Sequence, residues 1–472
     1  MCSPWHHRVW IVQEAALATE IVFICVEKLF TFEHMWYTAT FSQYLKDLRD
    51  KHGSLLDTSV FRNSATALHI RQLMKDDCVS GQWKLMFAAT ATALFHECLL
   101  PEDRVRGLLG LLQTSDLPVD LAYVGSDINI LYTKLAKHLP LTVNPQEPLW
   151  WDWLRYAAGF NRSKGLPSWV PDLHHMGLGE GPTGDVILQT YGNDPDQHIS
   201  RLEPDVPLRT RASARVTTVK GGEGWNEVLL KGKIVDEVRE VYDTIPSSSS
   251  VPSRPPHLPE AKSEEKQETH ESSIAVSEWE ECIADAVLHN DPEGIINGDA
   301  APKHHTIDLE IYYRTLRGDA TNFDMITVQL YEEFRLNGQL LRKVMKHLDT
   351  NPSSKVNGID VINIPIEDQT DRDLMDATRD VFRLFCDMLQ KLTDRQLFLS
   401  KEGGFGYAIL GVQPGDVVCV FAGVPTPHIL RNLDNAGDQS DRWQFVGDAY
   451  VHGLMKGEAD AMDVEEKYIV LV

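Results

Sequence analysis

Residues 4–18 read Pro-Trp-His-His-Arg-Val-Trp-Ile-Val-Gln-Glu-Ala-Ala-Leu-Ala and form a dense amphipathic block. The apolar residues Val9, Val12, Ala16 and Leu17 recur at helical spacing, which predicts a helix over about residues 6–18. Most chains begin with a few loosely held polar residues. We therefore expect this chain to begin inside a packed domain, after the first elements of that domain.

Helical patterns dominate the sequence that follows this block. The apolar, β-branched run within Glu20–Leu29 predicts a strand. Pro101 predicts the start of a helix with Asp103 in its first turn, and Ser126 is a candidate N-cap for a helix through His138. Further helices are predicted at residues 31–51, 61–76, 82–98 and 149–159.

After Leu166-Pro167 the pattern changes to short alternating runs, which are typical of an antiparallel sheet. Strands are predicted at residues 186–191, 215–220 and 228–242, the last with a break around Gly232. Residues 246–272 have almost no apolar side chains to offset the entropy of ordering, which predicts disorder. Helices are predicted at residues 274–292, 306–318, 325–349 and 367–392, and strands at 396–400, 416–421, 429–433, 443–446 and 467–472.

These patterns predict an α+β protein that ends in a small antiparallel β-barrel or sandwich. The predicted parts are a helix-rich region over 1–160, antiparallel strands over 161–245, a disordered linker or loop insertion over 246–272, a helical region over 273–395 and a β-rich region over 396–472.

Composition excludes several classes of protein. The 69 acidic residues outnumber the 45 Lys and Arg residues, and a formal charge of −24 repels nucleic acids and anionic membranes. The longest apolar runs are far shorter than the ~20 residues of a membrane span, and no secretory signal is present. The 7 cysteines form no CxxC pair, so we expect free thiols in a reducing cytoplasm and no metal site.

Several short motifs lie in series along the chain. Residues 101–112 read Pro-Glu-Asp-Arg-Val-Arg-Gly-Leu-Leu-Gly-Leu-Leu, and residues 166–172 read Leu-Pro-Ser-Trp-Val-Pro-Asp. Residues 413–419 read Gln-Pro-Gly-Asp-Val-Val-Cys, and residues 445–453 read Phe-Val-Gly-Asp-Ala-Tyr-Val-His-Gly. Together with residues 8–14, these segments resemble fungal heterokaryon-incompatibility (HET) domain proteins, with Arg106 standing where an aromatic or small apolar residue is usual.

The residues that carry this resemblance are spread over the whole chain. They are Arg8, Trp10, Gln13, Glu14, Asp103, Arg104, Gly107, Ser168, Trp169, Pro171, Asp172, Gly415, Asp416, Arg431, Gly447, Tyr450, His452 and Gly453. In the family the first of these segments lies well inside the HET domain. The resemblance therefore implies that residues 1–160 hold the C-terminal portion of a TIR-like α/β HET domain whose first part is lacking.

The resemblance implies a function in fungal non-self recognition and the programmed cell death that follows fusion of incompatible hyphae. This would be a cytoplasmic interaction and signalling protein rather than a metabolic enzyme, without a cofactor. Its partners would be other proteins, either an incompatibility partner or a second copy of the chain.

Physical reasoning assigns structural roles to most of the motif residues. Trp169, held between two prolines, is expected to pack the linker against the helical part. Pro414 and Gly415 fit the central positions of a type II turn. Asp103 and Arg104 are expected on a partly solvated face of their helix.

Two alternatives remain open. Some TIR domains cleave NAD with a glutamate on a helix, and by analogy Glu14 is the candidate catalytic residue for stabilising an oxocarbenium-like transition state. Under that alternative alone NAD would be the substrate. The second alternative is that the chain is a truncated, non-functional fragment.

Overall fold

A computed structural model of the chain gives the fold. The structure describes residues 8–25, 28–31, 34, 37, 59–75, 81–111, 127–141, 150–158, 162–176, 219–221, 226–244, 283, 311–312, 315–316, 395–422, 424, 426–433, 442–455 and 457–472. The predicted disordered segment 246–272, the strand at 186–191 and the helices at 325–349 and 367–392 lie outside these residues, as does most of the helix predicted at 31–51.

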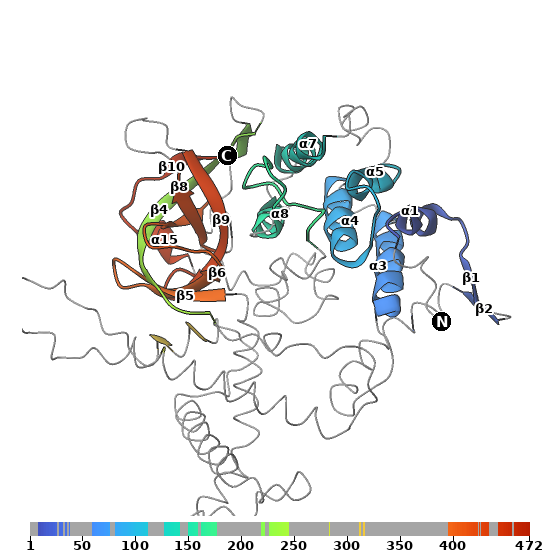
Figure 1. Cartoon of the computed structure of the whole chain (residues 1–472), viewed down its shortest axis with the longest axis horizontal. Coiled ribbons are helices and arrows are strands. Elements are labelled where there is room, and N and C mark those ends of the chain that lie inside the picture. Colours follow the sequence, from blue (N-terminus) through green and yellow to red (C-terminus); the bar gives the residue numbers. More distant parts are fainter. Residues whose placement is uncertain are drawn as a thin grey trace, which may run out of the picture.

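The first part of the chain is mainly helical, as its sequence pattern predicts (Figure 1). Its elements are α1 (Trp10–Leu17), β1 (Val22–Cys25), β2 (Lys28–Thr31), α3 (Ser59–Met74), α4 (Gly81–Phe95), α5 (Asp103–Leu109), α7 (Ile128–Leu141) and α8 (Trp150–Ala157). We call these helices the helical part.

Two local predictions in the helical part are wrong. The single strand expected over Glu20–Leu29 is an antiparallel hairpin in which β1 pairs with β2. The apolar run fits an extended chain, but it does not show where the chain reverses. The expected cap at Ser126 is replaced by Asp127, whose Oδ1 accepts the backbone N–H of Asn129 at 3.0 Å and of Ile130 at 3.3 Å. Aspartate is as good an N-cap as serine, so the neighbouring residue takes the role.

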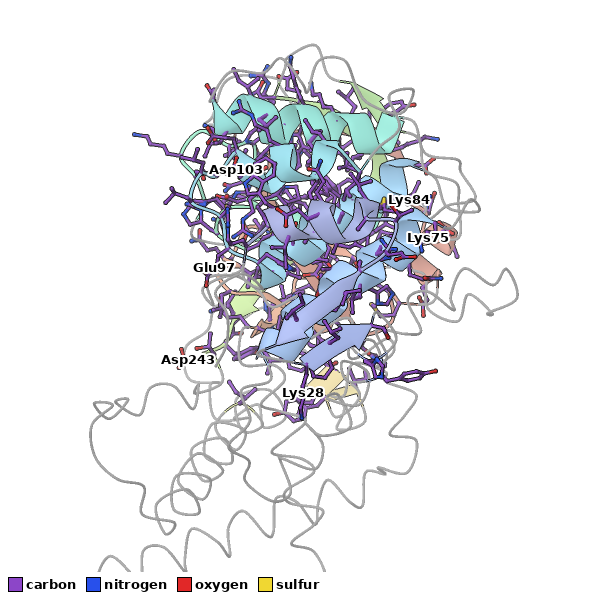
Figure 2. The ribbon with its side chains drawn as sticks, turned by 90° about the vertical axis from the view of Figure 1, so that its right-hand side faces the viewer. Lys28, Lys75, Lys84, Glu97, Asp103 and Asp243 are labelled. Carbon is purple, nitrogen blue, oxygen red and sulfur yellow. The ribbon has the colours of Figure 1, made fainter. Side chains whose placement is uncertain are left out.

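Cations from neighbouring elements cover the C-terminal ends of several helices. The last carbonyl groups of a helix have no partner within it and carry partial negative charge, so they attract donors with positive charge. The pairs are Arg71 to Ala15 at 2.8 Å, Lys84 to Met74 at 3.4 Å, Arg104 to Thr92 at 2.8 Å, Arg162 to Ala157, and Lys233 to Ala459 at 3.0 Å. Figure 2 labels Lys84 and Lys75, the residue that follows α3.

The first of these pairs connect the helices in a series. Arg71 on α3 binds the end of α1, Lys84 on α4 binds the end of α3, and Arg104 on α5 binds the end of α4. Arg71 and Arg104 are both only 5% exposed, so their charges are neutralised mainly by carbonyl dipoles rather than by water.

The strands of the second part form one large sheet. They are β3 (Val219–Gly221), β4 (Val228–Val241), β5 (Arg395–Ser400), β6 (Phe405–Ile409), β7 (Val417–Phe421), β8 (His428–Asn432), β9 (Arg442–Val451) and β10 (Lys467–Leu471), with the short helix α15 (Glu458–Ala461) before β10. The pairings run β4–β5–β6–β9–β8–β7 and return to β4, and all of them are antiparallel. We call this closed set the strand ring. The coarse α+β prediction is confirmed.

Strand β4 differs from its prediction in two ways. It continues through Gly232, which pairs with Phe421 and Lys467 instead of breaking the strand. A Cβ at Gly232 would lie 2.8 Å from the Val420 carbonyl oxygen, so the glycine permits a close strand approach. β4 also comes from the predicted region 161–245 but pairs with strands of the predicted region 396–472, so these two stretches share one sheet.

The sheet has two further features that the sequence pattern did not show. β6 lies in a stretch for which the sequence pattern predicts no strand, and a Cβ at Gly406 within it would lie 2.2 Å from the Tyr450 carbonyl oxygen. β10 pairs antiparallel with β4 but parallel with β9.

The helical part and the strand ring share a hydrophobic core. One cluster of buried side chains runs from Ile11 on α1 through Trp153 on α8 to Phe445 on β9 and Leu471 on β10. In Figure 1, α7 and α8 lie between the other helices and the ring. A Cβ at Gly447 would lie 3.1 Å from the Ala158 Cβ, so this glycine lets the end of α8 approach β9 closely. None of the described helices is both long enough and apolar enough to cross a membrane.

Candidate functional site

Two of the predicted motifs meet where α1 packs against α5. Trp10 Nε1 donates a hydrogen bond to Asp103 Oδ2 at 3.3 Å. A Cβ at Gly107 would touch the Trp10 ring at 3.7 Å, and a Cβ at Gly110 would lie 2.1 Å from Gln13 Nε2. The two glycines therefore make room for Trp10 and Gln13, and this motif contact joins two helices.

The prediction of a partly solvated face is wrong for Arg104. Its side chain is 5% exposed and donates to the Thr92 carbonyl at 2.8 Å and to the His96 carbonyl. The sequence shows the apolar face of α5 but not the end of α4, whose unsatisfied carbonyls bind the guanidinium.

Glu14 lies on α1 with its side chain exposed to solvent. Arg8, which precedes this helix, is exposed as well. Stabilisation of an oxocarbenium-like transition state requires preorganised groups in a site that excludes water. The position of Glu14 in solvent does not favour that chemistry.

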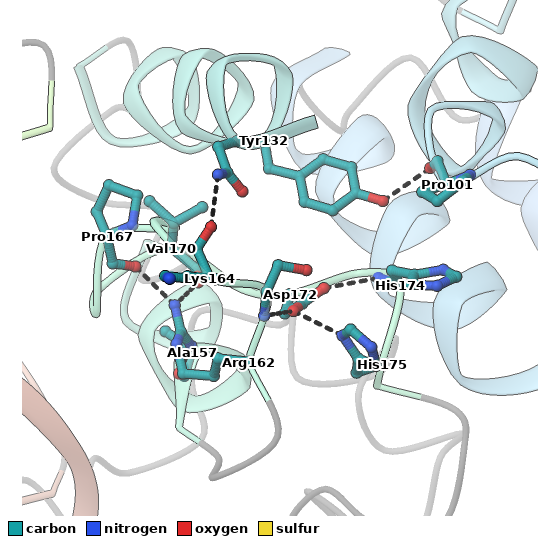
Figure 3. Close-up of polar contacts among 12 residues, drawn as sticks. Pro101, Tyr132, Ala157, Arg162, Lys164, Pro167, Val170, Asp172, His174 and His175 are labelled. Atoms are coloured by element: carbon teal, nitrogen blue, oxygen red, sulfur yellow. Dashed lines mark hydrogen bonds and ion pairs between the residues drawn. The ribbon is translucent and has the colours of Figure 1, made fainter. Parts of the chain in front are cut away.

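The segment 162–176 contains a network of polar contacts next to the helical part (Figure 3). Arg162 lies at its start and donates to the carbonyls of Ala157, of Pro167 at 2.6 Å and of Val170 at 2.5 Å. Burial lowers the pKa of the Arg162 guanidinium to about 10, although the negative charge of Asp172 opposes this shift. Arg162 thus ties the end of α8 to the Pro167–Val170 turn.

Ser168 and Trp169 connect this segment to the strands. The Ser168 N–H donates to the Val472 carbonyl at 2.9 Å, and Ser168 Oγ accepts the Phe445 N–H at 2.8 Å. Trp169 is 2% exposed, and its Nε1 donates to the Asn226 carbonyl at 3.0 Å. Trp169 therefore packs between the helices and the strands, as the packing interpretation of the motif predicts, and Pro171, two residues further on, is buried as well.

Asp172 organises the end of the segment. Its Oδ2 accepts the Ser163 N–H at 2.6 Å and lies 2.8 Å from His175 Nδ1, while Oδ1 accepts the His174 N–H at 3.1 Å. Burial alone would raise the pKa of Asp172, but the hydrogen bonds from His175 and Ser163 bring it below its ordinary value. Asp172 is thus an ionised carboxylate that holds the turn closed.

Sequence reasoning missed Arg162, His174 and His175. The histidine pair follows the Trp-Val-Pro-Asp motif after one intervening residue, Leu173, and this closeness to an aspartate is the signal that points to it. The two rings are edge to face, with centroids 4.7 Å apart.

The motif residues of the strand ring build its turns and its charge pairs. Gly415 has φ +93° and the Asp416 N–H donates to the Gln413 carbonyl at 3.1 Å, which confirms the predicted type II turn. Asp416 accepts two hydrogen bonds from Arg431, from Nε and Nη2, each at 2.8 Å. The hydrogen bond to Asp416 raises the pKa of Arg431 above its ordinary value.

The remaining motif residues lie on or just after β9. Tyr450 stacks on Tyr407 with ring centroids 5.1 Å apart, and the His452 N–H donates to the Phe405 carbonyl at 3.0 Å. Gly453 has φ +84°, a conformation that favours glycine. The motif residues thus form separate contact points instead of one cluster, and among the described residues no group of three or more His, Cys, Asp and Glu side chains is arranged to hold a metal ion.

Comparison with known proteins identifies the relatives of the chain. Residues 331–471 match the family model described as the Het-6 beta-barrel domain. A stretch of 83 residues, 17% of this chain, is 34% identical to "Heterokaryon incompatibility protein 6, OR allele" of Neurospora crassa and spans 12% of that protein. Part of this chain is thus similar to heterokaryon-incompatibility proteins. The resemblance to HET-domain-containing proteins is therefore confirmed. No solved structure matches.

The Het-6 match covers β10 and every strand of the strand ring except β4. β4 nevertheless supplies pairings to β5, β7 and β10. The described part of the Het-6 segment therefore depends on a strand that comes from much earlier in the sequence.

Proposed function

We propose that the chain acts in fungal heterokaryon incompatibility, as a cytoplasmic interaction and signalling protein in the non-self recognition that leads to programmed cell death. The observation that carries the proposal is the Het-6 match on strands that share a core with the helical part. The match also supports the interpretation of the strand ring as a small β-barrel. The TIR-like origin of the helical part stays a prediction.

The contacts between the helical part and the strand ring favour a protein that binds a partner and transmits this binding from one part to the other. The motif residues join α1 to α5 and join the segment 162–176 to β9 and Val472. A partner that displaced Phe445 or Val472 would therefore also displace Ser168 of the segment 162–176. The partners would be other proteins, either an incompatibility partner or a second copy of the chain, because a charge of −24 repels nucleic acids.

The test is controlled expression of the full chain in a filamentous fungus, with dye uptake in fused hyphae as the measure of cell death. We expect death above the level of an empty vector. We also expect Glu14→Gln to be as active as the unchanged chain, because Glu14 lies in solvent.

A chain that accumulates normally and leaves fused hyphae viable would refute the proposal. Death that depends on Glu14 and is accompanied by loss of NAD would instead establish the NAD-cleaving alternative.

A further inference from the structure

The segment 162–176 is fastened on two sides. On the helical side Arg162 binds the end of α8, and Asp172 binds the Ser163 N–H. On the ring side Ser168 binds Phe445 and Val472. Any change that loosens Asp172 and its neighbours therefore weakens the connection between the helical part and the strand ring.

The His174 ring has a buried nitrogen that makes no hydrogen bond to any described residue. Its side chain is half-buried, and within the described part of the chain Nδ1 has no hydrogen-bond partner. The Asp172 oxygens already receive the Ser163 N–H, the His174 N–H and the His175 ring. A proton on His174 would thus add charge to a site whose carboxylate is already engaged.

The charged groups around His174 oppose its protonation. Burial lowers the pKa of His174 from its ordinary value of 6.5, and the nearby His175 and Arg104 lower it further, while Asp172 only partly compensates. Arg104 is fixed in place because it binds the end of α4.

The other titratable groups near Asp172 and Arg104 do not supply a compensating charge. Burial raises the pKa of Tyr132 well above its usual range, and the phenol donates to the Pro101 carbonyl at 2.7 Å, so it stays neutral. Burial also raises the pKa of the Cys98 thiol. Glu102 on the helical part lies 3.7 Å from Arg106, its ion-pair partner.

We propose that His174 is an acid-sensitive latch: when its ring takes up a proton, the segment 162–176 loosens its contacts with the helical part and the strand ring, while the common core stays intact. In the closed state His174 binds a proton less readily than in the open state. Acid therefore favours opening once the pH falls below the open-state pKa of about 6.5. The effect grows as the pH falls and is complete below the closed-state value.

Asp172 does not open the latch in this range. Its pKa lies below the ordinary value of 3.8, so its hydrogen bonds persist while His174 titrates. The latch thus responds to mild acid without general acid unfolding. Each pH unit between the two pKa values of His174 raises the opening constant by up to about tenfold.

The experiment is hydrogen–deuterium exchange of the full chain at pH 7.5 and pH 5.5, corrected for the intrinsic pH dependence of exchange. In the unchanged chain we expect amides of residues 163–174 to lose protection several-fold at pH 5.5. We expect His174→Gln to abolish this loss. His69→Gln, at a half-buried histidine on α3, should leave it unchanged.

Equal corrected protection at the two pH values in the unchanged chain would overturn the proposal, even if the variants fail to fold. The same loss of protection in His174→Gln as in the unchanged chain would also overturn it. A fall confined to residues 163–174 and absent from His174→Gln would establish the latch, whatever the outcome for the role in incompatibility.

Discussion

The helical part and the strand ring pair their cations with different kinds of acceptor. In the helical part Arg71 and Arg104 bind uncharged carbonyl groups at helix ends. In the ring Arg395 and Arg431 bind the carboxylates of Asp448 and Asp416. The difference follows from the backbone, because a helix leaves its last carbonyls without partners, whereas paired strands use theirs laterally.

Lys233 shows that the type of element packed against a cation decides which acceptor it binds, whichever part of the molecule it belongs to. It lies on β4 but donates to the carbonyls of Ala459, Asp460 and Met462 at the end of α15. Among these cations, those near a helix end thus bind its carbonyls, whereas Arg395 and Arg431, which lie on strands, bind carboxylates.

The largest expected effect is at the buried ion pair of the ring. Arg395 and Asp448 have side-chain exposures of 3% and 4% and are 2.7 Å apart. Arg395→Met removes the cation that lies against the buried Asp448 carboxylate, so we expect a loss of about 3–5 kcal/mol in the free energy of unfolding by urea. Adding Asp448→Asn should recover part of this loss. A double variant as unstable as Arg395→Met would mean that charge is not the cause.

The second largest loss of stability is expected at Arg71, a buried cation of the helical part. Arg71→Met removes the donor that serves Ala15, Ala16, Ala18 and Thr19 but leaves no unpaired charge. We therefore expect a smaller loss of about 2–3 kcal/mol, measured in the same way.

The matched control for Arg71 is Arg106→Met, because Arg106 is 38% exposed and its pair with Glu102 is 3.7 Å long. Its expected cost is below about 0.5 kcal/mol. If the Arg71 and Arg106 variants lost the same free energy of unfolding, the carbonyl contacts of Arg71 would not be what stabilises the helical part.

A third, pH-dependent effect lies in the segment between the regions. Because the pKa of Asp172 in the folded protein lies below 3.8, its stabilisation is present at neutral pH and is lost as the pH falls through the folded-state value. Asp172→Asn should cost about 1–2 kcal/mol at pH 7 and progressively less below pH 3.8.

Asp127→Asn is the control for Asp172, since asparagine keeps the cap of α7 and should be nearly neutral. A cost of Asp172→Asn that stays constant down to low pH would show that the carboxylate charge plays no part in closing the turn.

The smallest effect is expected at the contact of α1 with α5. A Cβ at Gly110 would meet only the end of the flexible Gln13 side chain, which can move aside. Gly110→Ala should change the free energy of unfolding by less than about 1 kcal/mol. A larger loss would mean that the Gln13 position is rigidly required.

The sequence predicts the positions of helices and turns better than it predicts which strands pair with each other. The periodic apolar residues predict α3 and α4 to within a few residues, and the Pro414-Gly415 turn is correct. The pairing of Gly232 with Phe421 was missed because glycine reads as a break, and its strand partner lies far along the chain.

The same limit applies to the polar contacts. The motif residues were found by resemblance, but the sequence does not show that Arg104 binds the end of α4 or that Asp172 meets His175. Such contacts depend on where a helix ends and on which element packs against it, and neither follows from local periodicity.

The central claim is that the helical part and the strand ring form one cooperative body through their common core and the segment 162–176. The most direct test is urea unfolding of the full chain, followed by circular dichroism at a helical wavelength and by tryptophan fluorescence, since Trp153, Trp169 and Trp443 are buried where the parts meet. We expect the two transitions to coincide at neutral pH, as two-state unfolding requires. Loss of the helical signal at lower urea than the fluorescence change would contradict the claim.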